Sequence, residues 1–246
     1  MSVQIKADGN ANLIGSLWMI AAMAVFAIED ALIKAVSATL PMGQILIIFG
    51  GFGAAIFALI ARSKGQSLRN PDVLSKPMRI RAGFEITGRL FYFLALAMIP
   101  LSAATVILQA TPLVVVAGAA IVFGEQVGWR RWTAIFIGLA GVLIIIQPGS
   151  DGFSALSILA VIGMLGFAGR DLASRAAPAS LSATVLGVYG FLAVVVAGVA
   201  FSLWDQAPFV RPDSQTAATL LGAILAGVAA YTCLMTAMRT GDVSAV

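Results

Sequence analysis

The most constraining feature of the sequence is a series of apolar segments, each about as long as a bilayer is thick. A membrane-spanning helix needs ~20 mostly apolar residues, and lipid offers no partner to exposed backbone groups, so spans must be helical. Eight segments of the 246-residue chain meet this length, at about residues 13–36, 42–61, 80–99, 102–124, 131–147, 154–176, 182–203 and 216–238. The predicted fold class is therefore all-α, a polytopic bundle of membrane helices.

The composition excludes several other classes of protein. Only 11% of the residues are charged, against ~25% in a typical soluble domain. The chain has no His and a single Cys, Cys233, which excludes His-based catalysis, His metal sites and an intrachain disulfide. Phosphate-binding loops, CxxC pairs and dinucleotide-binding turns are also absent from the sequence. We therefore expect neither an enzyme nor an ATP-driven pump, and we expect no cofactor or metal.

The basic residues predict an orientation in the membrane, because Lys and Arg are concentrated in cytoplasmic loops. If the N-terminus is cytoplasmic and the spans alternate, the outer side holds only Lys34 and Arg211, and Arg89 lies within a span. The other 12 of the 15 basic residues fall on the cytoplasmic side: Lys6, Arg62, Lys64, Arg69, Lys76, Arg79, Arg81, Arg130, Arg131, Arg170, Arg175 and Arg239. The net charge of +4 thus indicates membrane topology, and we expect no nucleic-acid partner.

An internal repeat relates the sixth predicted span to the first. A shift of 141 residues places Phe26-Ala27 on Phe167-Ala168, Asp30 on Asp171 and Lys34 on Arg175. Ala97-Met98 matches Ala237-Met238 at nearly the same offset. The shared pattern is F-A-x-x-D-x-x-x-[K/R], which favours a duplication.

Five spans separate the two copies, and because five is odd the second copy is inverted in the membrane. Inverted repeats are typical of secondary transporters, which hold their substrate near the midplane between the repeats. The predicted first repeat covers residues 1–148, and the predicted second repeat covers residues 149–246. The second repeat would contain spans six to eight and the start of a ninth, so we expect a C-terminally truncated form of a ten-span protein with little activity of its own.

The segment from Arg81 to Pro148 resembles the EamA-type half of the drug/metabolite transporter superfamily. The matching residues follow in order along three spans: Arg81, Ala97, Ser102-Ala103-Ala104, Pro112-Leu113, Gly124-Glu125, Gly138, Gly141 and Pro148. The resemblance implies a ten-helix carrier of the inner membrane with two inverted five-helix repeats. It also implies a small-molecule substrate, amino-acid-like or amphipathic, and it leaves a homodimer open.

We therefore expect a secondary transporter, an exporter or exchanger of small organic metabolites that works by alternating access. The alternative is a non-transporting membrane structural or assembly subunit, or an inactive truncated fragment. A membrane-embedded enzyme is disfavoured because no His or metal-ligand set is present.

Charged residues within spans are costly and so are candidates for function. Glu85 and Arg89 lie four residues apart on one predicted helix face, where they can pair. One interpretation is a structural ion pair. The other is a substrate or ion site, in which Glu85 titrates and Arg89 binds a carboxylate; Tyr92 and Gln109 are further candidates for this site.

The repeat-related charges are candidates for gates. One interpretation is that Asp30 and Asp171 pair with the basic residues four positions on, Lys34 and Arg175, at opposite membrane surfaces. The other is that they close each side in turn, together with Glu29 and Arg170, which occupy matched positions with opposite charge. The predicted gating set is Glu29, Asp30, Lys34, Arg170, Asp171 and Arg175.

Two further features concern the shape and packing of single helices. Pro112 interrupts the fourth span and frees a carbonyl one turn back, which Thr111 or Gln109 can satisfy; this predicts a kink or a substrate contact. Gly50, Gly51 and Gly53 give the second span a small face for close packing.

Overall fold

The computed structural model describes residues 9–124, 128–146, 155–178 and 180–240, and every regular element in these ranges is a helix. Glu125, Pro148 and the predicted repeat boundary at residues 148 and 149 lie outside them. The elements are α1 (Gly9–Val36), α2 (Met42–Ser63), the 3-10 helix η1 (Pro71–Leu74), α3 (Lys76–Met98), α4 (Leu101–Leu108), α5 (Thr111–Phe123), α6 (Trp129–Ile146), α7 (Ser157–Arg175), α8 (Ala183–Asp205) and α9 (Ser214–Thr240).

The predicted fourth span is divided into α4 and α5 by a break at Gln109 and Ala110. Pro112 lacks a backbone N–H, so it cannot donate to the carbonyl of Leu108. The hydroxyl of Thr111 donates to that carbonyl instead, at 2.6 Å. The predicted kink is therefore confirmed, and Thr111 supplies the predicted compensation.

Six helical segments in the described part of the chain are long and apolar enough to cross a bilayer: Leu13–Val36, Met42–Ser63, Leu101–Phe123, Ser157–Arg175, Ala183–Asp205 and Ser214–Met238. The sequence predicted eight spans, and the two others correspond to α3 and α6. Arg81, Glu85 and Arg89 lower the apolar character of α3, and the apolar segment of α6 that the structure describes fully, Trp132–Gly141, is shorter than a span.

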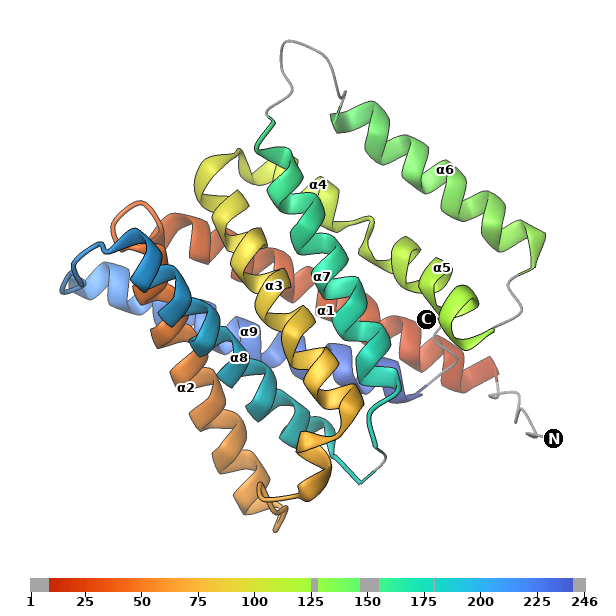
Figure 1. Cartoon of the computed structure of the whole chain (residues 1–246), viewed down its shortest axis with the longest axis horizontal. Helices are drawn as coiled ribbons and strands as arrows, with labels where there is room; N and C mark the ends of the chain where they lie inside the picture. Colours follow the sequence, from red (N-terminus) through yellow and green to blue (C-terminus); the bar gives the residue numbers. More distant parts are fainter. Residues whose placement is uncertain (1–8, 125–127, 147–154, 179, 241–246) are drawn as a thin grey trace.

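Helices from the two halves of the chain pack in pairs (Figure 1): α1 against α9, α2 against α8 and α3 against α7. The long α4–α5 segment packs along α7, and α6 lies outside this core against α4 and α5. The core therefore forms between the two halves of the chain rather than within either half.

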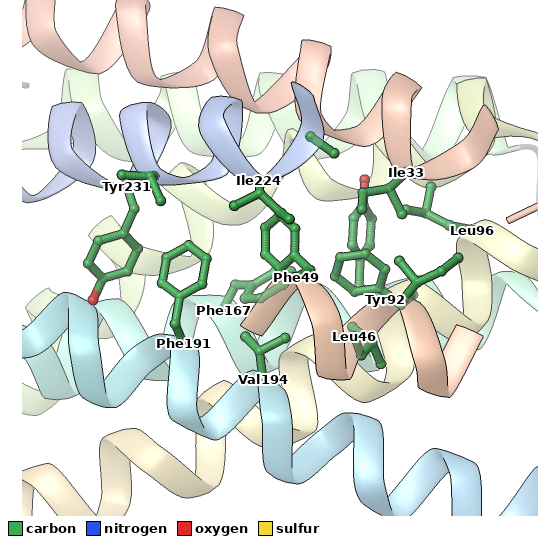
Figure 2. Packing of buried hydrophobic residues seen from close by; sticks show 14 of the residues in the cluster. Ile33, Leu46, Phe49, Tyr92, Leu96, Phe167, Phe191, Val194, Ile224 and Tyr231 are labelled. Atoms are coloured by element: carbon green, nitrogen blue, oxygen red, sulfur yellow. The ribbon is translucent and has the colours of Figure 1, made fainter. Parts of the chain in front are cut away.

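The α2–α8 pair is packed around aromatic rings (Figure 2). The ring of Phe191 lies 5.3 Å from that of Phe49 and 6.0 Å from that of Tyr231, between centroids. A Cβ atom on Gly53 would approach the Phe191 ring to 2.0 Å, whereas one on Gly51 would meet nothing within 4 Å. A Cβ atom on Gly50 would lie 2.8 Å from the backbone of α8. The predicted small face is thus confirmed for Gly50 and Gly53 but not for Gly51.

The backbones of α3 and α7 also approach closely where the two helices cross. A Cβ atom on Gly166 would lie 2.5 Å from the Cα of Gly88, and one on Gly163 would lie 2.8 Å from the backbone nitrogen of Tyr92. Small residues permit such contacts between membrane helices. The sequence analysis did not single out these three glycines, because their partners lie on distant segments.

Candidate substrate cavity

Seven charged side chains are buried in the described part of the bundle, and three helices carry them. Glu29 and Asp30 come from α1, and Arg170 and Asp171 come from α7. The remaining three, on α3, are Arg81, Glu85 and Arg89. Charges at this depth are costly unless they are paired, and charged side chains of α3 pair with those of both α1 and α7.

Glu85 is the centre of this cluster. Its Oε1 lies 3.4 Å from Arg89 Nε and 3.5 Å from Arg170 Nη1, and its Oε2 lies 3.4 Å from Arg81 Nη2. The side chain is only 1% exposed. The predicted contact between Glu85 and Arg89 is confirmed, and the two other arginines make Glu85 the carboxylate that joins α3 to α7.

Arg89 connects this cluster to α1. Its Nη1 lies 3.1 Å from Glu29 Oε1. Three aromatic rings surround its guanidinium, at 5.4 Å (Phe167), 5.7 Å (Phe93) and 5.9 Å (Phe49) from the ring centroids. Two carboxylates and three ring faces therefore compensate the charge of Arg89.

The repeat-related acids have partners other than those predicted. Asp30 Oδ2 accepts a hydrogen bond from the hydroxyl of Tyr92 at 2.6 Å, and Asp171 Oδ1 lies 2.8 Å from Arg170 Nη2. The ammonium of Lys34 donates to the carbonyls of Leu96 and Ile99 at the end of α3. The expected Asp30–Lys34 pair was therefore wrong, because the free carbonyls at the α3 terminus bind the ammonium instead.

The expected pairing of Asp171 with Arg175 was wrong for a similar reason. Arg170 is adjacent to Asp171 and donates to its Oδ1 from Nε as well, also at 2.8 Å. The guanidinium of Arg175 lies over the ring of Phe123, 5.5 Å from its centroid. Arg170, which makes two bonds to the carboxylate of Asp171, therefore binds it in preference to Arg175, which lies a full helical turn away.

Arg81 has partners that the sequence analysis missed. Its guanidinium donates to Ser174 Oγ at 2.9 Å and to the hydroxyl of Tyr231. Ser174 follows Arg170 by four residues, so helical spacing places both on the face of α7 that meets α3. That spacing was the available signal for Ser174, whereas no local pattern indicates Tyr231.

A cavity of about 350 Å³ opens beside this cluster, between α1, α3, α4, α5, α7 and α9. Six polar side chains line it: Asp30, Arg89, Tyr92, Thr111, Arg170 and Asp171. The rest of the lining is apolar: Met19, Met23, Phe26, Leu108, Pro112, Leu113, Val115, Val116, Phe167, Leu234 and Met238. A mostly apolar wall with a few convergent polar groups is typical of a site for a small organic molecule.

The cavity collects some of the predicted site residues and leaves others out. Glu29 and Glu85 lie behind its wall, in contact with Arg89. Gln109 is exposed, and neither Gln109, Lys34 nor Arg175 is among the lining residues. Asp30 and Asp171, expected near opposite membrane surfaces, line the same cavity.

The apolar lining includes residues that the sequence analysis did not single out as site residues. Met19, Met23, Phe26 and Asp30 follow at intervals of three and four along α1, so they share one helix face. This spacing was visible in the sequence. It does not distinguish a cavity wall from a packing face, and only the neighbouring helices decide between them.

Helices long and apolar enough to span a bilayer, together with a partly charged central cavity, define a multi-pass membrane transporter. The model of the EamA-like transporter family matches residues 13–147, and the chain belongs to this family. It is thus a member of a transporter family rather than of an enzyme family.

Curated relatives extend the match beyond the first half. The chain is 31% identical over 207 residues to the pseudopaline exporter CntI of Pseudomonas aeruginosa, covering 80% of this chain and 68% of the exporter. It is 26% identical over 222 residues to the riboflavin transporter of Rhizobium johnstonii, covering 89% and 72% of the two chains. The riboflavin transporter of Vibrio cholerae is also 26% identical, over 212 residues, covering 84% and 70%.

A solved crystal structure has the same fold. It superposes with a TM-score of 0.71 at 22% identity, and the match covers 96% of this chain and 82% of that one.

Proposed function

We propose that the protein is a secondary carrier that moves small organic metabolites across the inner membrane, as an exporter or exchanger. The observation that carries this proposal is the mostly apolar cavity with buried charges of both signs in its wall. A small organic metabolite that fits a cavity of about 350 Å³ can be held by such a wall through non-covalent contacts alone. The relatives are named as an exporter of pseudopaline and as transporters of riboflavin, which supports the same class of activity.

Alternating access would arise from two inverted repeats, residues 1–148 and 149–246. The 141-residue offset relates α1 to α7, α2 to α8 and α3 to α9. A two-fold axis would exchange the two helices of each repeat-related pair. The contact between α1 and α9 would then become the contact between α7 and α3, and the contact between α2 and α8 would be unchanged. These three pairs make the most extensive helix–helix contacts in the described part of the chain, which supports a two-fold relation between the repeats.

The polar contacts between helices would serve as gates in this mechanism. Asp30 with Tyr92, and Lys34 with the α3 carbonyls, connect α1 to α3. Arg170 with Glu85 connects α7 to α3. Opening the cavity to the other side requires α3 to separate from one of its neighbours. We therefore retain Glu29, Asp30, Lys34, Arg170, Asp171 and Arg175 as the proposed gating set.

A flux assay tests the carrier function. The protein is reconstituted into liposomes loaded with a pool of metabolites, and solute exchange is followed by mass spectrometry. We expect Val116→Trp to reduce flux to the level of protein-free liposomes, because Val116 lines the cavity and the indole would fill it.

The matched control is Val122→Trp, on the same helix but 64% exposed, which should transport like the unchanged protein. Equal flux from both variants would contradict transport through this cavity. Absence of flux from the unchanged protein, together with co-purification of a fixed partner, would instead favour the assembly-subunit alternative.

A further inference from the structure

The charges buried in the described part of the bundle do not balance. Four are carboxylates, of Glu29, Asp30, Glu85 and Asp171, and three are the guanidinium groups of Arg81, Arg89 and Arg170. Glu29, Glu85 and Asp171 each form a salt bridge with an arginine. Asp30 is the carboxylate of this set without a salt bridge to any described residue, although its side chain is largely buried, at 7% exposed.

The neighbouring cations are already engaged. Arg89 is bound by Glu29 and Glu85, and Arg170 is bound by Asp171 and Glu85. Lys34 lies one turn beyond Asp30, but its ammonium is held by the carbonyls at the end of α3. Both arginines are paired with other carboxylates and the Lys34 ammonium is bound by backbone carbonyls, so no cation of the described residues forms a salt bridge with Asp30.

The partner that Asp30 does have is neutral. The Tyr92 hydroxyl donates to Oδ2 at 2.6 Å. A neutral donor orients a carboxylate and satisfies one of its acceptor positions, but it leaves the net charge in place. Asp30 also lines the cavity, so the uncompensated charge faces the space where a ligand would lie.

We propose that Asp30, oriented by Tyr92, binds the positively charged group of the transported metabolite, so that the cavity takes an organic cation such as a protonated amine with an apolar body. A cation here would give Asp30 the kind of charged partner that the three other buried carboxylates already have, and its attraction to Asp30 is strengthened by the low dielectric constant of the surroundings.

The wall next to Asp30 fits the apolar part of such a molecule. Met19, Met23 and Phe26 continue the face of α1 that carries Asp30, at three- and four-residue intervals. All three line the cavity, and the ring of Phe167 lines it from α7. Thioether and aromatic side chains adapt to irregular apolar shapes. We therefore expect Asp30 to select the charge of the ligand, whereas this wall selects the shape of its apolar part only loosely.

This inference deepens the proposed carrier function, and a binding measurement tests it separately from transport. Three probes share a phenyl ring and a similar chain length but differ in charge: 2-phenylethylammonium, 3-phenylpropan-1-ol and 3-phenylpropanoate. Each is titrated calorimetrically into the purified protein in detergent at neutral pH. We expect the ammonium to bind about tenfold more tightly than the alcohol, ~1.4 kcal/mol, and the carboxylate to bind most weakly.

The variants assign this preference to Asp30. Asp30→Asn keeps an acceptor for the Tyr92 hydroxyl but removes the charge, and it should abolish the tenfold preference for the ammonium. Asp30→Glu keeps the charge and should retain the preference for the cation. Asp205→Asn removes an exposed carboxylate at the end of α8 and should bind all three probes like the unchanged protein.

Two results would overturn the inference: an Asp30→Asn variant that still prefers the ammonium, or an unchanged protein that prefers 3-phenylpropanoate. The comparison of the three probes on the unchanged protein needs no variant, so it tests the inference even if Asp30→Asn fails to fold. Metabolite flux together with binding that shows no charge preference would support the carrier function and contradict the cation site at Asp30. Charge-selective binding without any flux would support the cation site and contradict the carrier function.

Discussion

At the scale of single residues, Glu85 illustrates how the structure separates two interpretations of a buried charge. The sequence offered either a structural ion pair or a substrate or ion site. Three guanidinium groups lie within 3.5 Å of its carboxylate, and Glu85 does not line the cavity. These contacts favour the structural interpretation for Glu85, whereas Asp30 is the carboxylate of the cavity wall without a salt bridge to a described residue.

We expect Glu85→Gln to lower the free energy of unfolding by about 3–5 kcal/mol, because it leaves three guanidinium groups with one carboxylate fewer. The measurement is the melting temperature of the purified protein in detergent, with Asp205→Asn as the exposed control. Any flux that the variant retains should keep the pH dependence of the unchanged protein. A variant of normal stability whose flux has an altered pH dependence would assign Glu85 to ion or substrate binding instead.

At the scale of elements, the crossing of α3 and α7 determines whether the charged cluster can form. Gly88, Gly163 and Gly166 let the two backbones touch, and this approach brings Arg170 within 3.5 Å of Glu85. The kink at Pro112 acts in the same way on another wall, since it places Thr111 and Pro112 in the cavity lining. Backbone shape, rather than side-chain chemistry, positions these parts of the site.

We expect Gly166→Ala to destabilise the protein and to reduce flux, because the new Cβ would lie 2.5 Å from backbone atoms of Gly88, which cannot rotate away. Gly51→Ala is the matched control. It is also a helical glycine, and its Cβ would meet nothing within 4 Å, so the change should be neutral or stabilising by up to ~1 kcal/mol. Melting temperatures of both variants check the prediction. Equal values would show that α3 and α7 can move apart at their crossing without a loss of stability.

At the scale of the whole molecule, the arrangement of helix pairs depends on both halves of the chain, and the orientation in the membrane depends on the charges between the helices. The cytoplasmic N-terminus remains a prediction, supported by the 12 basic residues that this orientation places inside. The link between α2 and α3 is central to it, because it carries Lys64 and Arg69 and is flanked by Arg62, Lys76 and Arg79, all of them exposed.

Cysteine labelling tests this orientation. In a Cys233→Ser background, Ser67→Cys marks the link between α2 and α3, and Ser214→Cys marks the start of α9; both serines are exposed. A membrane-impermeant maleimide applied to spheroplasts should label Ser214→Cys only, and both positions should react after the membrane is permeabilised. Labelling of Ser67→Cys in intact spheroplasts would reverse the orientation.

The sequence by itself predicted the helices and proposed the repeat. Apolar length predicted the helices, because a bilayer imposes a minimum span on each one. Pro112 and Thr111 predicted the break between α4 and α5, because the missing N–H and its replacement are adjacent in the chain. The offset between Asp30 and Asp171 nominated two of the residues that line the cavity.

Only the tertiary structure decided the partners of the charges. Local spacing paired Asp30 with Lys34 and Asp171 with Arg175, yet Tyr92 and Arg170 bind these acids. Arg81 and Tyr231 are 150 residues apart, and nothing in either segment indicates the other. A buried charge is stabilised by whichever donors the packed helices bring within reach, and that choice depends on the crossing of distant backbones rather than on neighbours in the sequence.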